Sequence, residues 1–342
     1  MKKKVLVIRF SSIGDIIQCM SVIEPLVHQL DADVHWISRS DFTPMLSTNP
    51  HLFKIWSYEK RTGMKGLVKM IALLRKEKFD YIYDAHQNIR SFIVRTLIGF
   101  PHLNWNMKFT VRRKSRLRRF AFFQLNIRKA IPMPFRSVES FQKPLKKWGI
   151  DISKEYVTDW RFNPEIVSKG KELLGNVLEE EKVITIVPSA AWELKRWPVK
   201  YWRELVRRMS DYRFVIIAGP DDTFTKKIEE VDPSRVFNLA GKTNLQESFF
   251  IISQSQVVVS ADTGFLHAAD LFHVNAIALM GPTAFGHPTG KTVRVMEINN
   301  LKCRPCTKAG NTVCKMPEEY RACLLNIKPR MVIDAMKESF NI

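Results

Sequence analysis

The stretch that decides the fold is VVVSADTGFLHAADLFHVNAIALMGPTAFGHPTG, Val257–Gly290. It begins with a β-branched run suited to a buried parallel strand, passes through a polar turn at Ser260–Gly264, and continues with helical apolar spacing to Leu271. A second apolar run, Ala276–Met280, ends in the tripeptide GPT. Parallel strands that end in neighbouring polar turns form the ligand-binding edge of an open α/β sheet. The stretch therefore predicts a ligand site at the ends of these two strands.

The turn Asp262-Thr263-Gly264 carries groups that suit a phosphate ligand. The first N–H groups of a helix lack partners within the helix, and the helix dipole is positive at that end, so a diphosphate is a natural ligand. Thr263 adds a hydroxyl, Gly264 allows close approach to the backbone, and His267 lies one helical turn further on the same face. Alternatively, Asp262 and Thr263 simply cap the helix.

Length and composition favour two globular α/β domains. The chain has 342 residues, 45% of them hydrophobic, and no apolar run approaches the ~20 residues of a membrane-spanning helix. The apolar run near the N-terminus is interrupted at Arg9 and no small-residue cleavage site follows, so it predicts a first strand and not a signal peptide. With five cysteines and no export signal, we expect reduced thiols in a cytoplasmic protein.

Strands and helices are expected to alternate in both halves of the chain. Strands are predicted at Lys4–Arg9 and Tyr81–Asp84 in the first half, and at Lys182–Val187 and Arg213–Ile217 in the second. The polar, charged stretch Asp159–Glu181 separates the halves. The alternation predicts a parallel, Rossmann-like sheet in each half.

Further short motifs accompany the opening stretch. They are SSIGD at residues 11–15, WELKRWP at 192–198, AGPDD at 218–222 and LAGKTNL at 239–245. Together with the D-T-G-x-x-H helix start and the following GPT, they resemble the motifs of the heptosyltransferases, glycosyltransferase family 9. The resemblance covers most of the chain and is strongest from Lys182 to Gly290.

This resemblance implies an α/β fold of the GT-B type, in which two Rossmann-like domains face a central cleft. We expect an N-terminal acceptor-binding domain at residues 1–158, a linker at 159–181 and a C-terminal nucleotide-sugar-binding domain at 182–328. A final helix at 329–342 is expected to pack back towards the first domain, as in that family.

Two residues receive catalytic roles from the resemblance. Asp15 matches the aspartate that acts as base in the family, and an inverting transfer needs one carboxylate to accept the proton of the attacking hydroxyl. Lys195 matches the lysine beside the phosphates of the departing nucleotide, where it stabilises negative charge that grows in the transition state. The alternatives are that Asp15 caps a helix and that Lys195 is solvated.

Three more residues are assigned to the nucleotide by resemblance. Asp222 is expected at the ribose and Thr243 near the adenine ring, although turn chemistry or a structural loop also accounts for them. Ser189 is the nearest hydroxyl for the phosphates, because Ala190 and Ala191 stand where the family often has Ser or Thr.

The resemblance also implies the substrates. The donor is expected to be ADP-heptose, and the acceptor a lipid-linked saccharide, the lipopolysaccharide inner core, at the inner face of the cytoplasmic membrane. No cofactor, catalytic metal or nucleic-acid partner is expected. The last motif reads GPTAFGHPTG where relatives more often finish with a G-P pair, so the details of donor recognition stay open.

A basic tract accounts for most of the net charge of +20. Between Lys108 and Lys147 there are thirteen Lys or Arg residues and one acid, Glu139. Such a tract, with interleaved phenylalanines, suits an anionic membrane surface or acceptor phosphates, although it can also be a solvated face. The arginines assigned to this role are Arg112, Arg113, Arg116, Arg118 and Arg119.

Four cysteines are clustered near the C-terminus with the spacing C-x2-C-x7-C-x8-C. They are Cys303, Cys306, Cys314 and Cys323. Four thiolates with one tight C-x-x-C pair can bind structural zinc, and free or redox-active thiols are the alternative.

Two other function classes compete with a glycosyltransferase. A sugar-nucleotide epimerase can share the GT-B architecture but does not need a basic membrane-facing tract. A nucleic-acid-binding protein would explain the charge, yet it would leave the D-T-G-x-x-H and K-R-W-P motifs without a role, and no nucleic-acid-binding motif accompanies the tract.

Overall fold

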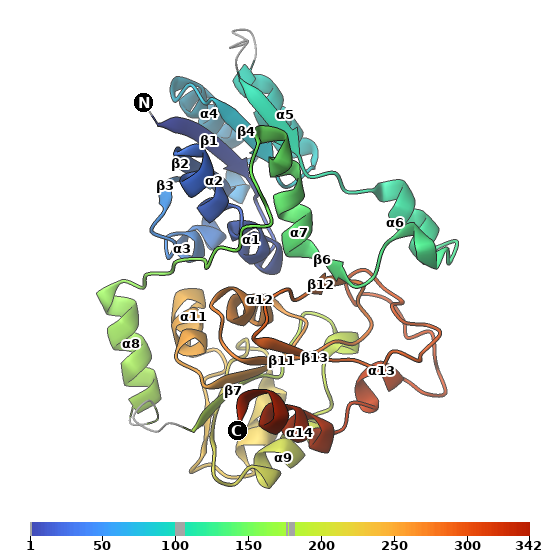
Figure 1. Cartoon of the computed structure of the whole chain (residues 1–342). Helices are drawn as coiled ribbons and strands as arrows, with labels where there is room; N and C mark the ends of the chain where they lie inside the picture. The colour runs from blue at the N-terminus through green and yellow to red at the C-terminus, as the bar shows by residue number, and fades with distance from the viewer. Residues whose placement is uncertain (1, 100–106, 176, 178–181) are drawn as a thin grey trace. The chain divides into compact units, whose positions relative to one another are not determined.

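The chain forms two compact units in the computed structural model, which describes residues 2–99, 107–175, 177 and 182–342 (Figure 1). Unit 1 comprises Met1–Arg116 and Ser137–Arg161. Unit 2 comprises Leu117–Arg136 and Phe162–Ile342. Each unit is built around its own parallel sheet.

Unit 1 contains a five-stranded parallel sheet in the order β3-β2-β1-β4-β5. The strands are β1 (Lys3–Ile8), β2 (Ala32–Arg39), β3 (Leu52–Tyr58), β4 (Tyr81–Asp84) and β5 (Lys108–Val111). Its helices are α1 (Ile13–Met20), α2 (Ile23–Leu30), α3 (Thr43–Leu46), α4 (Gly63–Lys76), α5 (Ile89–Gly99) and α7 (Ser137–Gln142). Because the strand order reverses between β1 and β4, the carboxyl ends of these two strands mark the expected ligand-binding point of the sheet.

Unit 2 contains a six-stranded parallel sheet in the order β13-β11-β10-β7-β8-β9. The strands are β7 (Val183–Val187), β8 (Arg213–Ile216), β9 (Val236–Asn238), β10 (Val257–Ala261), β11 (Ala276–Leu279) and β13 (Val293–Met296). Here the strand order reverses between β7 and β10, which is the doubly wound arrangement. The prediction of a parallel Rossmann-like sheet in each half is confirmed.

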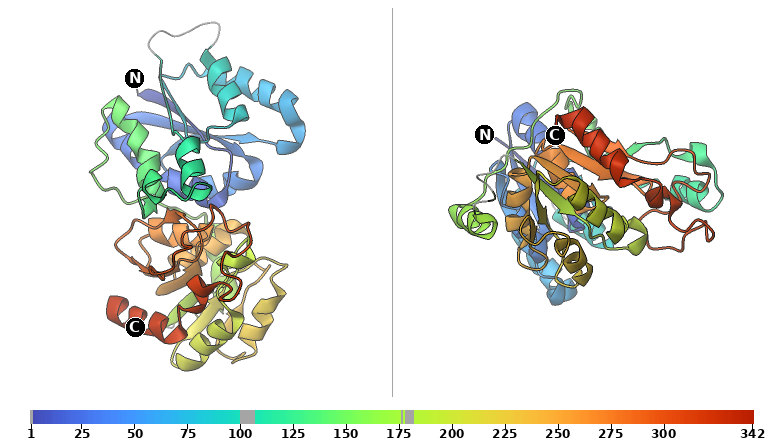
Figure 2. Two further views of the ribbon diagram at one scale, coloured as in Figure 1. Left: turned by 90° about the vertical axis from the view of Figure 1, so that its right-hand side faces the viewer. Right: turned by 90° about the horizontal axis from the view of Figure 1, so that it is seen from below.

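Unit 2 has helices on both faces of its sheet and further helices beside it (Figure 2). They are α6 (Arg116–Phe123, of which Arg116 belongs to unit 1), α8 (Pro164–Leu174), α9 (Val199–Arg208), α10 (Lys226–Glu229), α11 (Leu245–Ser253), α12 (Gly264–Leu271), α13 (Ala322–Leu325) and α14 (Pro329–Phe340). A separate two-stranded ladder joins β6 (Phe135–Arg136) to β12 (Phe285–His287). In the described part of the chain, no helix has the length and apolar character needed to cross a membrane.

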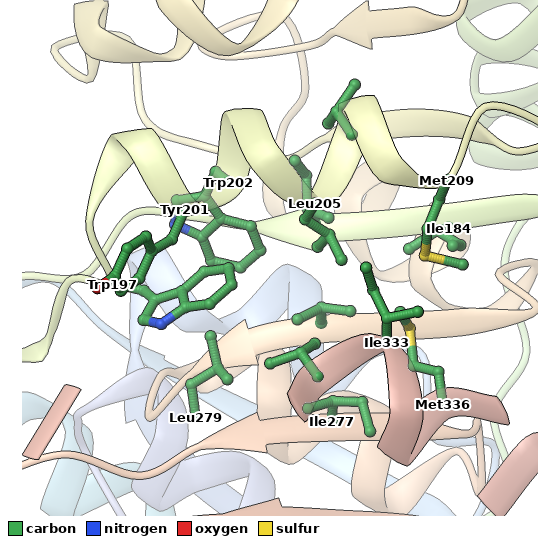
Figure 3. Packing of buried hydrophobic residues seen from close by; sticks show 14 of the residues in the cluster. Ile184, Trp197, Tyr201, Trp202, Leu205, Met209, Ile277, Leu279, Ile333 and Met336 are labelled. Atoms are coloured by element: carbon green, nitrogen blue, oxygen red, sulfur yellow. The ribbon is translucent and has the colours of Figure 1, made fainter. Parts of the chain in front are cut away.

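The hydrophobic core of unit 2 includes one face of the C-terminal helix. Ile333 and Met336 of α14 are buried in one hydrophobic cluster with Trp202 of α9 and with Ile277 and Leu279 of β11 (Figure 3). Burial of this apolar face, at about 25 cal/mol per Å², holds α14 on the sheet of unit 2. The helix at 329–342 therefore packs on the sheet of unit 2.

The segment Leu117–Arg136 also belongs to unit 2, although the predicted boundary placed residues 1–158 together. Phe122 and Ile131 are buried against Ala284, and Phe135 meets Phe285 edge-on at 4.9 Å between ring centroids. Because of these apolar contacts, the segment packs with unit 2 although its sequence neighbours on both sides belong to unit 1. Composition alone did not reveal them, because the segment reads as one continuous basic tract.

The predicted linker at 159–181 contains a packed helix. Helix α8 begins at Pro164. Its N-cap is Asn163, whose side chain accepts a hydrogen bond from the N–H of Ile166. Gly170 lies so close to the ring of Phe250 on α11 that an added Cβ would approach it to 2.2 Å. The chain passes from one unit to the other between Arg161 and Phe162, and α8 is part of unit 2.

Candidate functional site

Asp15 lies in the first turn of α1, directly after the carboxyl end of β1. Its Oδ2 atom is 2.5 Å from Nη2 of Arg9 and accepts a hydrogen bond of 3.2 Å from the hydroxyl of Ser12. The N-cap position of α1 is occupied by Ser12, so Asp15 is not the cap that the alternative interpretation required. The carboxylate instead contacts side chains at the switch point of the sheet in unit 1.

Arg112 approaches the same carboxylate from the residue after β5, with Nη1 at 4.0 Å from Oδ1 of Asp15. Burial alone would raise the pKa of Asp15, but the charges of Arg9 and Arg112 and the hydrogen bond from Ser12 outweigh burial and hold the pKa below its ordinary value. Asp15 is therefore ionised at neutral pH and can accept a proton only from a group brought close to it.

Positive charge exceeds negative charge around Asp15. Arg9 is only 2% exposed, and its Nη1 donates to the carbonyl of Ala85 at 2.7 Å. The guanidinium of Arg112 stacks 3.6 Å from the ring centroid of Phe141, and burial lowers the pKa of Arg112 to about 10, which leaves it charged at neutral pH. Two buried guanidinium groups facing one carboxylate retain positive charge for an anionic ligand.

His86 borders this group without adding to its charge. Its Nδ1 accepts a hydrogen bond of 3.2 Å from the N–H of Phe10. Burial first, and then the charge of Arg9, lower the pKa of His86 to about 3, so the imidazole is neutral at physiological pH.

The five arginines assigned to a membrane or acceptor surface do not form one surface. Arg112 is 5% exposed and contacts Asp15, so its assignment to a membrane surface is corrected. Arg119 is half-buried, with its guanidinium 4.3 Å from the ring centroid of Phe285. Arg113, Arg116 and Arg118 are exposed.

The principal cluster of unit 2 joins the ends of three neighbouring strands. The Nζ atom of Lys195, in the loop after β7, is 3.0 Å from Oδ2 of Asp262, which directly follows β10. The hydroxyl of Thr283, beyond the end of β11, donates to the same oxygen at 2.6 Å. Nε2 of His267, on α12, lies 3.7 Å from Oδ1 of Asp262. The side chains predicted from the opening stretch and from the K-R-W-P motif thus meet at one point.

Two glycines with positive φ close over this cluster. At Gly286, with φ of 89°, an added Cβ would lie 3.1 Å from Oδ1 of Asp262 and 3.2 Å from Nε2 of His267. At Gly310, with φ of 90°, it would lie 2.8 Å from Cγ of Lys195. Both positions combine a left-handed backbone with close approach, so any larger residue would displace the lysine, the carboxylate or the imidazole.

Thr263 is the N-cap of α12, and its side chain accepts a hydrogen bond from the N–H of Leu266. The capping alternative therefore holds for Thr263. It does not hold for Asp262, whose carboxylate is engaged by Lys195 and Thr283. Gly264 is the first residue of the helix, as the sequence predicted for a phosphate-binding turn.

A second polar group lies at the ends of β7 and β8. The hydroxyl of Ser189 donates to Oδ2 of Asp222, which also accepts from the N–H of Gly219 at 2.9 Å. Nη2 of Arg196 is 3.3 Å from Oδ1 of Asp222. Arg196 was not assigned from the sequence, although it stands beside Lys195 in the K-R-W-P motif.

Thr243 lies in the loop that covers this second group. Gly241 donates its N–H to the carbonyl of Ala218 at 3.0 Å, which brings the L-A-G-K-T loop beside the turn that holds Asp222. The hydroxyl of Thr243 is 2.8 Å from that of Ser248 on α11. The structure thus places the two loops together, with the Thr243 side chain directed to α11.

All four clustered cysteines line one pocket together with Leu194 and Met316; they are Cys303, Cys306, Cys314 and Cys323. Burial raises the pKa of the Cys323 thiol to about 11 and also raises that of Cys306, and the neighbouring sulfurs add to both effects. The thiols are free in the structure, and Cys314 accepts a hydrogen bond of 3.4 Å from the N–H of Arg321. Their convergence agrees with either interpretation of the spacing, metal ligands or free or redox-active thiols.

The chain is similar in sequence to proteins of a known family. The family model described as glycosyltransferase family 9 (heptosyltransferase) matches residues 67–316. The chain is 22% identical over 315 residues to the lipopolysaccharide core heptosyltransferase OpsX of Haemophilus influenzae, covering 87% of this chain and 83% of that protein.

Solved structures share the fold. ADP-heptose lipopolysaccharide heptosyltransferase II of E. coli aligns with a TM-score of 0.73 at 20% identity, over 99% of this chain and 98% of that one. E. coli heptosyltransferase WaaC, solved with ADP, aligns with a TM-score of 0.69 at 17% identity, over 98% of this chain and 99% of that one. The predicted α/β fold of the GT-B type is confirmed.

Proposed function

We propose that this protein, which belongs to glycosyltransferase family 9, the heptosyltransferases, transfers a heptose from ADP-heptose to the inner core of lipopolysaccharide. Its membership of the family is shown by the family model, which matches most of the chain. The observation that carries the proposal is the cluster of Lys195, Asp262, Thr283 and His267 at the switch point of unit 2. Doubly wound sheets bind nucleotides at this point. The E. coli relative solved with ADP supports the choice of nucleotide.

Unit 2 binds the donor in this proposal. Lys195 meets the diphosphate and stabilises the charge that grows as the sugar leaves. Asp262 holds the ammonium in place and is itself held by a hydrogen bond from Thr283. The first turn of α12 at Gly264 presents N–H groups to the phosphates. The transfer needs no metal, because Lys195 and this helix terminus supply the positive charge.

The group around Asp222 binds the nucleoside. Asp222 accepts from the ribose hydroxyls, oriented by Ser189 and Arg196, and the loop at Thr243 borders the adenine. A carboxylate that already accepts two hydrogen bonds still has lone pairs for a further donor.

Unit 1 binds the acceptor and provides the base. Asp15 accepts the proton of the attacking acceptor hydroxyl. The hydroxyl oxygen attacks the anomeric carbon from the face opposite the diphosphate, so the configuration at that carbon is inverted. Arg9 and Arg112 supply the positive charge that attracts phosphate groups of the acceptor.

The exposed part of the basic tract docks at an anionic leaflet at the inner face of the cytoplasmic membrane. Arg113, Arg116 and Arg118 are exposed, and so are Leu117 and Phe120 of α6, at 86% and 56%. Cations beside exposed apolar side chains are typical of a surface that binds the lipid interface. Arg112 has no part in this surface, because it is buried.

The experiment is a transfer assay with ADP-heptose and an inner-core acceptor that lacks this heptose, read by mass spectrometry of the acceptor. We expect a gain of one heptose and release of ADP, unaffected by a chelator. Epimerised donor formed without acceptor would instead identify an epimerase. No transfer to any inner-core acceptor, with intact ADP binding, would refute the proposed acceptor while leaving the donor assignment in place.

A further inference from the structure

Two histidines and two carboxylates converge in unit 1 outside the groups assigned to the proposed reaction. Glu24 and His28 lie one turn apart on α2, His51 directly precedes β3, and Asp159 lies near the end of the segment that leaves unit 1. One ligand atom from each of Glu24, His28 and His51 lies within 4.8 Å of the other two. Asp159 is not one of these three residues, but its Oδ2 atom lies 3.5 Å from Nε2 of His51.

Glu24 is the centre of the group and is only 2% exposed. Its Oε1 atom accepts hydrogen bonds of 3.3 Å from the side chain of Asn49 and from the N–H of Asp159. Its Oε2 atom faces Nε2 of His28 at 3.5 Å and Nε2 of His51 at 3.6 Å. These separations exceed an ordinary N–H···O bond of about 2.9 Å, so one oxygen of a buried carboxylate faces two imidazole nitrogens without a hydrogen bond to either.

The separations match the ligand shell of a tetrahedral ion. Nitrogen and oxygen atoms bound to zinc at about 2.0–2.1 Å in a tetrahedron lie about 3.4 Å apart. The Nε2 atom of His51 is 3.5 Å from Oδ2 of Asp159, so three of the ligand pairs lie at 3.5, 3.6 and 3.5 Å. Two imidazoles and two carboxylates are a donor set that zinc accepts.

We propose that Glu24, His28, His51 and Asp159 bind one zinc ion. Four protein ligands close the coordination shell, which makes the ion structural and not catalytic. Two carboxylates balance its charge. The side chains of His28 and His51 are 48% and 31% exposed, so the ion can enter from solvent.

Neighbouring contacts already orient the ligands. The ring of Tyr156 stacks on His28 with an interplanar angle of 7°, and the backbone N–H of His51 donates to the side chain of Asn49 at 2.9 Å. Such supporting contacts hold metal ligands in place. The bound ion ties α2, the residue before β3 and the exit segment at Asp159 together, so zinc stabilises unit 1.

The test counts zinc ions on the full-length chain. Wild type and the double variant His28→Gln, His51→Gln are stripped with a chelator, freed of it, and titrated with zinc by calorimetry. The cysteine cluster is unchanged in both proteins, so any zinc that it binds cancels in the comparison. We expect the variant to bind one zinc fewer. His273→Asn, at an exposed histidine with positive φ that asparagine tolerates, is the matched control and should bind as many as wild type.

A second measurement uses the wild-type chain alone. Histidine modification by diethyl pyrocarbonate, mapped by mass spectrometry, should slow at His28 and His51 when zinc is added, with no change at His273. The melting temperature of wild type should rise with zinc more than that of the variant. Equal zinc stoichiometry and affinity in both proteins, or equal modification with and without zinc, would show that the histidines only pair with the carboxylates, and would overturn the proposal.

Discussion

The two candidate groups use charge in opposite ways. Around Asp15 in unit 1, two buried guanidinium groups face one carboxylate, so positive charge is left over. In unit 2, the ammonium of Lys195 is matched by the buried carboxylate of Asp262, so the pair is balanced. The first arrangement attracts an anion and keeps its carboxylate ionised. The second holds a lysine in a defined position for a ligand that changes its charge during the reaction.

Removing the carboxylate from the unbalanced group is expected to have the largest effect. Asp15→Asn preserves the shape of the side chain but removes the proton acceptor, so turnover should fall by ~10²-fold or more with saturating acceptor. ADP affinity, measured by calorimetry, should stay unchanged because the nucleotide is assigned to unit 2. Asp41→Asn, at an exposed aspartate of unit 1, is the control and should retain activity. Retention of more than about a tenth of wild-type turnover would remove Asp15 from the base role.

The exposed arginines of the basic tract are expected to affect membrane binding, unlike the buried Arg9 and Arg112 beside Asp15. Replacing Arg113, Arg116 and Arg118 with Gln should weaken binding to anionic vesicles by ~10²-fold, at about 1 kcal/mol for each cation near the surface. Vesicle sedimentation at low salt measures the effect, and ADP affinity should be unaffected. Three exposed lysines of unit 2, at positions 200, 226 and 227, provide a control with the same charge change. Equal weakening in the control would mean that only net charge matters.

The parallel sheets followed from the sequence because buried strands leave continuous apolar runs, as in β7 and β10. The site at the end of β10 was predicted from the strand-to-turn pattern around Asp262, whereas Lys195 was placed beside it only by the family resemblance. The assignment of Arg112 to a membrane surface failed because a buried arginine and a solvated one look alike within a basic run. The placement of α6 and α14 depends on long-range apolar packing that local periodicity does not encode.

Other residues left a faint signal in the sequence. Arg9 interrupts an otherwise apolar strand, which marks a buried charge in need of a partner, and that partner proves to be Asp15. The group of Glu24, His28 and His51 left only an E-x3-H spacing on one helix. The other two proposed ligands, His51 and Asp159, come from other parts of the chain, so the spacing alone does not predict a site.

Breaking the balanced pair is expected to have an intermediate effect. Lys195→Ala should weaken ADP binding by ~10-fold and slow transfer, since the ammonium meets the diphosphate in both the ground and transition states. It should also destabilise unit 2, because Asp262 is left buried with an uncompensated charge. The double variant Lys195→Met, Asp262→Asn should recover stability in urea unfolding without recovering ADP affinity. An unchanged ADP affinity in Lys195→Ala would exclude this lysine from the donor site.

The smallest effect expected is a change in pH dependence when the unbalanced group loses one cation. The folded-state pKa of Asp15 is depressed, so the stability that its ionised form contributes is present above the unfolded pKa and is lost as pH falls through the folded one. Arg112→Gln removes one of the charges that lower this pKa, so the acid limb of kcat/KM should move to higher pH. Arg112→Lys keeps the charge but loses the flat stacking on Phe141, and should move the limb less. If both variants shift the limb equally, stacking and not charge sets the proton affinity of Asp15; if neither does, Arg9 alone is sufficient to keep it ionised.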